Sequence, residues 1–239
     1  KGRDMEVSID LSFEESIFGV KKIISISKTS VCKDCGGNGA KSGTKLNTCK
    51  FCGGSGKVTE VRRSILGSFQ TVKTCEECFG SGKTPSEKCP TCKGAGIHKQ
   101  NEEMEINIPA GIDNGQMIKM TGLGETVRGG KSGDLYIKVR IKNNSDYRRE
   151  GVNLMKDISI KLTDAILGTI YKLKILEGNI VEVKIPEGIN NGEMLRVRGK
   201  GVPYQGGRGD IILSVKIEMP KKINHKEKEL IEKLKEVGL

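Results

Sequence analysis

All eight cysteines of the chain occur as pairs separated by two residues, and each pair opens the same pattern, Cys-x-x-Cys-x-Gly-x-Gly. The four copies begin at Cys32, Cys49, Cys75 and Cys89. Thiolate sulfur is a preferred ligand of Zn²⁺, and two cysteines three positions apart can bind one ion from a single tight turn. The glycines let the backbone turn back beside each pair without a Cβ in the way. Four such pairs supply two tetrahedral sites, so the spacing predicts two zinc ions per chain.

Two other uses of the cysteines must be weighed against zinc. A disulfide framework suits a small secreted chain, and 239 residues with other core-forming segments have little need of one. A thioredoxin-like thiol-disulfide oxidoreductase uses one reactive Cys-x-x-Cys at a strand-to-helix junction, and no strand–helix alternation surrounds these pairs. Metal-saturated thiolates are not available for exchange chemistry. We therefore expect a metal-binding protein that is not an enzyme.

The composition limits both the core and the surroundings of the protein. Apolar residues make up 35% and aromatic residues 4%, with no Trp, so the core must be built from Ile, Leu and Val. No stretch approaches 18 uninterrupted apolar residues, and we expect no membrane contact. The chain begins Lys-Gly-Arg-Asp, without an initiator Met or a signal peptide, which is typical of a piece of a longer protein. Thiols reserved for metal fit a reducing, cytoplasmic setting.

The charge distribution bears on a third possibility, a zinc-ribbon protein that binds nucleic acid. The formal net charge is +11, and two zinc ions with four thiolates each would lower it to about +7. Lys and Arg are spread along the whole chain, whereas a nucleic-acid footprint gathers them on one face. Base stacking needs aromatic side chains, and the cysteine region offers only Phe51, Phe69 and Phe79. We therefore do not expect nucleic acid as a partner.

The cysteine region interrupts a series of predicted β-strands. Residues 5–11, 104–108 and 135–141 alternate apolar and polar side chains, which is the period of a half-buried strand, and residues 20–27 form a further strand candidate. Residues 32–96, which hold all four motifs, lie between these strands. The cysteine region is therefore predicted to be an insertion in a β domain.

The β material is also duplicated. Residues 108–124 recur as residues 185–201 at a constant offset of 77, and residues 11–19 resemble residues 160–168. Two copies of one domain explain this self-similarity, and the short strands with Gly, Pro and Asn turns predict an all-β class. A polar turn cluster at 143–146 marks the boundary between the copies.

The predicted organisation is two tandem β-sandwich-like domains, with a zinc-finger β-hairpin module inserted in the first, followed by a C-terminal helix. The boundaries are 1–31 and 97–142 for the first β domain, 32–96 for the cysteine-rich module, 143–220 for the second β domain and 221–239 for the helix. Asn224 and Glu227 form a capping-box pattern at the start of this helix. Its apolar stripe either packs on its own domain, binds a partner or joins two copies of the chain, and the dimerising candidates are Leu230, Ile231 and Leu234.

Four Cys-x-x-Cys-x-Gly-x-Gly repeats inserted in the first of two duplicated β domains resemble the zinc-containing class of the DnaJ family of co-chaperones. The resemblance covers essentially the whole chain, including residues 10–19, the Ile-Pro-x-Gly-Ile repeats and residues 207–210. Members of this family begin with a helical J domain bearing His-Pro-Asp and a Gly/Phe-rich linker. In this chain the only histidines, His98 and His225, are each followed by Lys. We therefore expect a fragment without the J domain, unable by itself to stimulate the ATPase of a DnaK-type partner.

The resemblance implies how the cysteines are shared between the two zinc ions. The first and fourth motifs would hold one ion, and the second and third motifs the other. The ligands would be Cys32, Cys35, Cys89 and Cys92 for the first site and Cys49, Cys52, Cys75 and Cys78 for the second. Such nesting closes loops in a module too polar to form a core, which lowers the entropy of its unfolded state.

The resemblance also implies a groove on the first β domain that binds unfolded polypeptide. There an extended client segment adds a strand to a sheet edge and buries a side chain in an apolar pocket. The positions that align with the pocket are Met5, Ile24, Ile26, Met104 and Ile137. Alternating Ile and Met on strands are equally typical of an ordinary core. The expected function is a co-chaperone fragment that holds non-native clients, passes them to a DnaK-type chaperone and forms a homodimer in the full-length protein.

Overall fold

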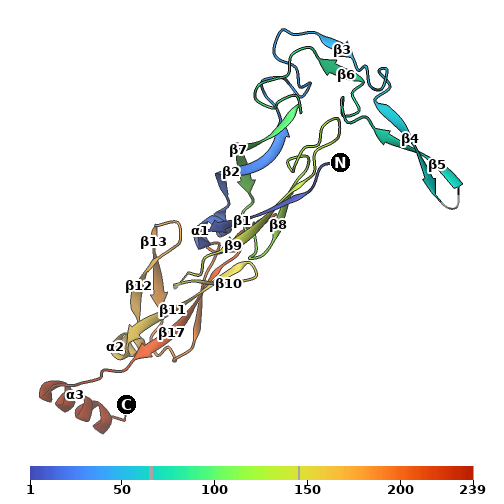
Figure 1. The fold of residues 1–239 in the computed structure, drawn as a ribbon. Coiled ribbons are helices and arrows are strands. Elements are labelled where there is room, and N and C mark those ends of the chain that lie inside the picture. Colours follow the sequence, from blue (N-terminus) through green and yellow to red (C-terminus); the bar gives the residue numbers. More distant parts are fainter. Residues whose placement is uncertain (65–66, 145, 239) are drawn as a thin grey trace. The chain divides into compact units, whose positions relative to one another are not determined.

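The computed structural model describes residues 1–64, 67–144 and 146–238, and within them the chain is built mainly of β-strands (Figure 1). The chain divides into two compact units. Unit 1 comprises residues 1–11, 21–108 and 113–141, and unit 2 comprises residues 12–20, 109–112 and those from 142 onward.

The β domain of unit 1 is built around the strand β1 (Met5–Leu11). It pairs in parallel with β9 (Leu135–Ile141), which in turn pairs antiparallel with β8 (Met117–Met120), so the order is β1-β9-β8. A second sheet joins the long strands β2 (Val20–Val31) and β7 (Ile97–Ile108). The predicted alternation is confirmed in β9, where Leu135, Ile137 and Val139 are buried and Lys138 and Arg140 are exposed.

Unit 2 repeats this topology with one strand more in its main sheet and an additional two-stranded sheet. Its main sheet has the order β10-β11-β17-β14, in which β11 and β17 are parallel and β14 is antiparallel to β17. These strands are β10 (Arg148–Glu150), β11 (Asn153–Lys161), β17 (Ile211–Glu218) and β14 (Met194–Val197). The smaller sheets are β12 (Thr169–Lys174) with β13 (Ile180–Ile185) and β15 (Pro203–Tyr204) with β16 (Gly207–Arg208). The same parallel and antiparallel pairing in both copies confirms the predicted duplicated all-β fold.

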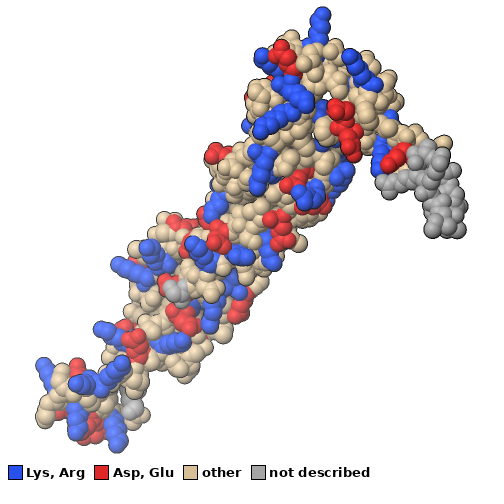
Figure 2. Space-filling model, in the orientation of Figure 1, with Lys and Arg blue, Asp and Glu red and all other residues tan. Residues whose placement is uncertain are grey.

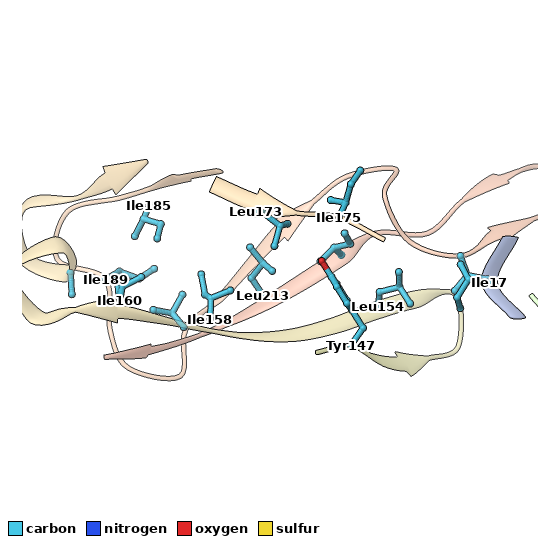
Figure 3. Close-up of a cluster of buried hydrophobic side chains, with 14 residues drawn as sticks. Ile17, Tyr147, Leu154, Ile158, Ile160, Leu173, Ile175, Ile185, Ile189 and Leu213 are labelled. Carbon is cyan, nitrogen blue, oxygen red and sulfur yellow. The ribbon is translucent and has the colours of Figure 1, made fainter. Parts of the chain in front are cut away.

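The core of unit 2 is a continuous cluster of buried apolar side chains (Figure 3). It is contributed mainly by β11 and β17, and Leu154, Leu173 and Leu213 are fully buried. The side chains are almost all Ile, Leu and Val, as the shortage of aromatic residues in the sequence requires. One aromatic residue, Tyr147, belongs to the cluster.

The cysteine-rich module contains short hairpins and little apolar core. Its paired strands are β3 (Leu46–Thr48) with β6 (Lys83–Pro85) and β4 (Lys57–Ser64) with β5 (Gly67–Thr74), both antiparallel. Among its described side chains, the buried apolar ones are Ala40 and seven of the eight cysteines. The side chain of Phe69, one of the aromatic residues considered for base stacking, lies outside the described part. The module therefore has no apolar cluster of its own in the described residues apart from the cysteines.

Two short helices occupy equivalent places in the two copies. The helix α1 (Phe13–Phe18) starts with a capping box between Ser12 and Glu15, and α2 (Leu162–Leu167) follows β11 directly. Both end at a glycine with positive φ, 75° at Gly19 and 73° at Gly168, a conformation that favours a residue without Cβ.

The helix α1 packs with unit 2, although residues 12–20 fall within the range 1–31 that the sequence analysis assigned to the first β domain. Ile17 of α1 is fully buried in the unit 2 cluster. The Gly111 amide donates to the Ser16 and Ile17 carbonyls, and residues 109–112 also belong to unit 2. The domain boundaries assigned from the sequence stay a prediction. Ser145, within the predicted boundary cluster, lies outside the described residues.

The C-terminal helix α3 (His225–Glu236) begins as the sequence indicates. Asn224 Oδ1 accepts the Glu227 amide at 2.9 Å, and Glu227 Oε2 accepts the Asn224 amide at 2.7 Å. All its residues are exposed, including the dimerising candidates Leu230, Ile231 and Leu234. Their apolar stripe is therefore not covered by the described part of the same chain.

Candidate metal centres

Backbone hydrogen bonds join the four cysteine motifs in two pairs. In each pair, the first cysteine of one motif donates its amide to the last glycine carbonyl of the other motif, and the partner motif returns the same bond. The donor and acceptor residues are Cys32–Gly96, Cys89–Gly39, Cys49–Gly82 and Cys75–Gly56, all at 2.9 Å. The first motif is thus paired with the fourth, and the second motif with the third.

This pairing brings the sulfur atoms into two groups of four. Between paired motifs, the Sγ–Sγ distances are 3.9 Å for Cys32–Cys89, 3.7 Å for Cys35–Cys92, 3.9 Å for Cys49–Cys75 and 3.6 Å for Cys52–Cys78. In each group all sulfur atoms lie within 4.8 Å of one another. A tetrahedron of thiolates about 2.3 Å from Zn²⁺ has edges of about 3.8 Å. The sulfur positions therefore fit a tetrahedral metal ion, and the two groups are those that the family resemblance implied.

The glycines of the motif are required by this close pairing. A Cβ at Gly96 would overlap the Gly37 carbonyl oxygen of the partner motif, and one at Gly39 would overlap the Gly94 carbonyl oxygen. The position directly after the second cysteine is different, because it holds Phe79 in the third motif at a positive φ of 51°. The sequence pattern thus keeps glycine where two backbones meet and admits a side chain where space is open.

Amide groups directed at sulfur favour the thiolate form that binds metal. In each motif the last glycine donates its amide to the second cysteine, as from Gly56 to Cys52 Sγ at 3.2 Å. Burial acts to raise the pKa of Cys52, but this amide and its neighbours outweigh it and lower the pKa to about 6. In the other group, burial raises the pKa of Cys32 to about 11. A bound Zn²⁺ would add a strong local positive charge and hold all four thiols deprotonated.

One residue that sequence reasoning missed connects three of the motifs. Arg128, from the loop between β8 and β9, donates to the Gly94 carbonyl at 2.8 Å and to the Asn38 carbonyl at 3.5 Å. Its guanidinium also lies 4.7 Å from the centre of the Phe79 ring. Arg128 therefore ties this loop to the cysteine-rich module. No spacing rule marks it in the sequence, because it lies 32 residues or more from every motif.

The predicted client-binding residues lie on four strands of unit 1. Met5, Ile24 and Met104 are half-buried, whereas Ile26 is 5% exposed and Ile137 is fully buried. The two buried side chains could form only the floor of a groove, and the other three its accessible part. The strand β1 that carries Met5 is an outermost strand of its sheet in the described residues. The groove itself stays a prediction.

The surface charge gives no support to the nucleic-acid alternative. Lys and Arg are mixed with Asp and Glu over the face shown in Figure 2. Many cations are paired, for example Lys41 with Glu87 at 2.9 Å and Lys216 with Asp157 at 2.7 Å. In the described part of the chain, no helix is long and apolar enough to cross a membrane.

Comparisons with known proteins give one consistent answer. The family model for the DnaJ C-terminal domain matches residues 5–220. The chain is 38% identical to a chaperone protein DnaJ of Acetivibrio thermocellus over 99% of its length. It is 41% identical to that of Thermosipho melanesiensis over 98%, and 42% identical to that of Ruminiclostridium cellulolyticum over 100%. The chain spans 62 to 64% of the length of these relatives.

Proposed function

Since this chain belongs to the DnaJ family, we propose that it is the client-binding part of a cytoplasmic co-chaperone that holds non-native polypeptide and passes it to a DnaK-type ATPase. The match of the family model over residues 5–220 carries this proposal. The 239 residues contain no His-Pro-Asp, so stimulation of the ATPase would need a J domain in addition. The role is binding and transfer rather than catalysis.

The proposed client site is the outer edge of β1 together with Met5, Ile24 and Met104. An extended segment can pair with an outermost strand through its backbone and place one apolar side chain beside these residues. Methionine adapts to ligands of different shape because its thioether chain is flexible. Burying a Leu or Phe side chain contributes about 1.5–3 kcal/mol, which suits weak and releasable binding. Ile26 and Ile137 would form the floor.

The two groups of cysteines are proposed to hold one zinc ion each, as structural crosslinks. Cys32, Cys35, Cys89 and Cys92 would hold the ion that joins the two ends of the module, and Cys49, Cys52, Cys75 and Cys78 the ion nearer the β4–β5 hairpin. Zinc supplies folding free energy here, because the ligands meet only when the module is folded. The exposed stripe of Leu230, Ile231 and Leu234 on α3 is proposed to join two chains in the full-length protein.

The client site is tested by suppression of aggregation of a chemically denatured client. Ile24→Ser should reduce suppression by about tenfold in effective concentration, because it places a hydroxyl in the apolar site. Ile23→Ser is the matched control, since Ile23 is 73% exposed and adjacent on β2, so the other face of the strand carries it. Equal suppression by the two variants would refute the assignment of the site.

A further inference from the structure

The internal duplication identifies a counterpart of the proposed client site in unit 2. Gly19 and Gly168 end equivalent helices with almost identical backbone angles, which fixes an offset of 149 residues between the two copies in this region. At that offset Met5 of β1 corresponds to Leu154 of β11. Ile24 corresponds in the same way to Leu173 of β12. The apolar character is retained at both positions.

The two copies differ in how far these side chains are covered. Met5 and Ile24 are half-buried, whereas Leu154 and Leu173 are fully buried. β1 and β11 pair with their parallel partners in the same way, so this pairing does not account for the difference. Something additional covers the site in unit 2.

Ile17 of α1 belongs to the buried cluster that holds Leu154 and Leu173, and a second covering element is the short strand β10 with the residue before it, Tyr147. Arg149 of β10 lies opposite Leu154 in an antiparallel pairing, on the edge of β11 that corresponds to the outer edge of β1. Tyr147 is 4% exposed and belongs to the same buried cluster as Leu154 and Leu173. Its hydroxyl donates to the Lys174 carbonyl of β12 at 2.9 Å. In Figure 3 the Tyr147 ring crosses the cluster from the β10 side, with its oxygen directed toward the strand of Leu173.

Polar contacts also hold this segment. Arg149 donates to the Ile112 carbonyl at 2.9 Å and to the Gly151 carbonyl at 2.8 Å, and Arg148 lies 3.6 Å from Asp157 Oδ1. Asn144 Oδ1 accepts the amides of Asp146 and Tyr147 at 2.7 and 3.0 Å. The Lys156 ammonium lies 4.5 Å from the centre of the Tyr147 ring and 3.1 Å from Asp146 Oδ2. A short stretch of backbone pairing with one large side chain in an apolar site is also how sheet edges bind extended peptides.

We propose that residues 146–150 are a built-in ligand strand, which fills in unit 2 the counterpart of the client site, so that this place is a second site for extended peptides when the strand is displaced. The peptides that fit carry one large aromatic or aliphatic side chain and pair antiparallel with β11. The proposal rests on the proposed function, because it takes the client site of unit 1 as the open counterpart. It also explains why one chain with two similar β domains would offer clients one open site of this kind among its described residues.

The test uses the full chain and a fluorescein-labelled peptide that copies residues 143–151, with binding measured by fluorescence anisotropy. All variants carry Ile24→Ser, which removes the site in unit 1. To this background we add Tyr147→Ala, which takes away the side chain that fills the site, or Tyr147→Phe as the matched control, which keeps the ring. The Tyr147→Ala protein should bind the peptide at least about tenfold more tightly than the Tyr147→Phe protein.

The outcomes separate this proposal from the proposed function. Equal affinity of the Ala and Phe variants would overturn the built-in strand. Loss of the far-ultraviolet β signal in the Tyr147→Ala protein would overturn it too, because the strand would then be part of the core rather than a displaceable ligand. If Ile24→Ser alone leaves peptide binding of the parent chain unchanged, the client site of unit 1 fails instead. The built-in strand would then be tested by the number of peptides bound per chain. The Tyr147→Ala variant without Ile24→Ser should bind one peptide more than the parent chain.

Discussion

The cysteine-rich module and the β domain of unit 2 solve the same problem of stability in different ways. Unit 2 buries a continuous cluster of Ile, Leu and Val between its sheets, so its fold depends on apolar surface removed from water. In the module, the described buried apolar side chains are almost all cysteines, and the strands β3 and β6 have three residues each, none of them buried. A chain segment with no apolar core can be stable only if crosslinks lower the entropy of its unfolded state. The comparison teaches that two groups of four cysteines stand here where unit 2 has an apolar core.

Removal of metal should therefore have the largest effect, and it should affect the cysteine-rich module but not the β domain of unit 2. A strong chelator under reducing conditions should unfold residues 32–96, because binding of structural zinc is worth about 10–16 kcal/mol in small zinc domains. Hydrogen exchange measured by mass spectrometry should show loss of protection in β3 and β6, with β11 and β17 still protected. A module that stays protected after metal analysis shows less than one tenth of the zinc would contradict the comparison.

A smaller effect is expected when one of the two sites is broken by a single methyl group. Gly96→Ala should lower the zinc content from two ions per chain to about one, since the new Cβ overlaps the Gly37 carbonyl oxygen. Gly36→Ala is the control, because Gly36 also has a positive φ but has open space around it. Both substitutions cost about 1–2 kcal/mol in backbone conformation, so the overlap is the difference between them. Two bound zinc ions in both variants, by metal analysis and thiol titration, would show that the close backbone approach is not required.

The smallest effect is a cavity in the core of unit 2, which should leave the metal sites untouched. Leu213→Ala removes a fully buried side chain and should lower the free energy of unfolding of this unit by about 2–5 kcal/mol. The measurement is urea unfolding followed by circular dichroism, with zinc content measured in parallel. Ile212→Ala, on the other face of β17 and only half-buried, should cost clearly less. A loss of zinc in Leu213→Ala would mean that core and metal sites are coupled.

Much of the local structure could be predicted from the sequence because it depends on short-range patterns. Alternation at residues 5–11 and 135–141 gave strands where β1 and β9 lie, since a period of two places apolar side chains on one face. The capping box of Asn224 and Glu227 is formed as its spacing indicates. Alternation does not say what covers a face, however. Met5 and Leu154 occupy equivalent positions in alternating strands, and only the second is fully buried.

The sequence by itself determined that this protein has eight cysteines in four Cys-x-x-Cys pairs and two copies of one β domain. Ligand chemistry and repeated spacing are properties of the residues alone, and no distant contact can change them. The tertiary structure decided which motif faces which, that Arg128 joins the cysteine-rich module, that α1 packs with unit 2, and that Tyr147 fills one copy of a site whose counterpart is less covered. Each of these depends on residues far apart in the chain that meet only after folding. These contacts depend on how closely the side chains of packed strands fit together, and a local pattern of residues does not determine this fit.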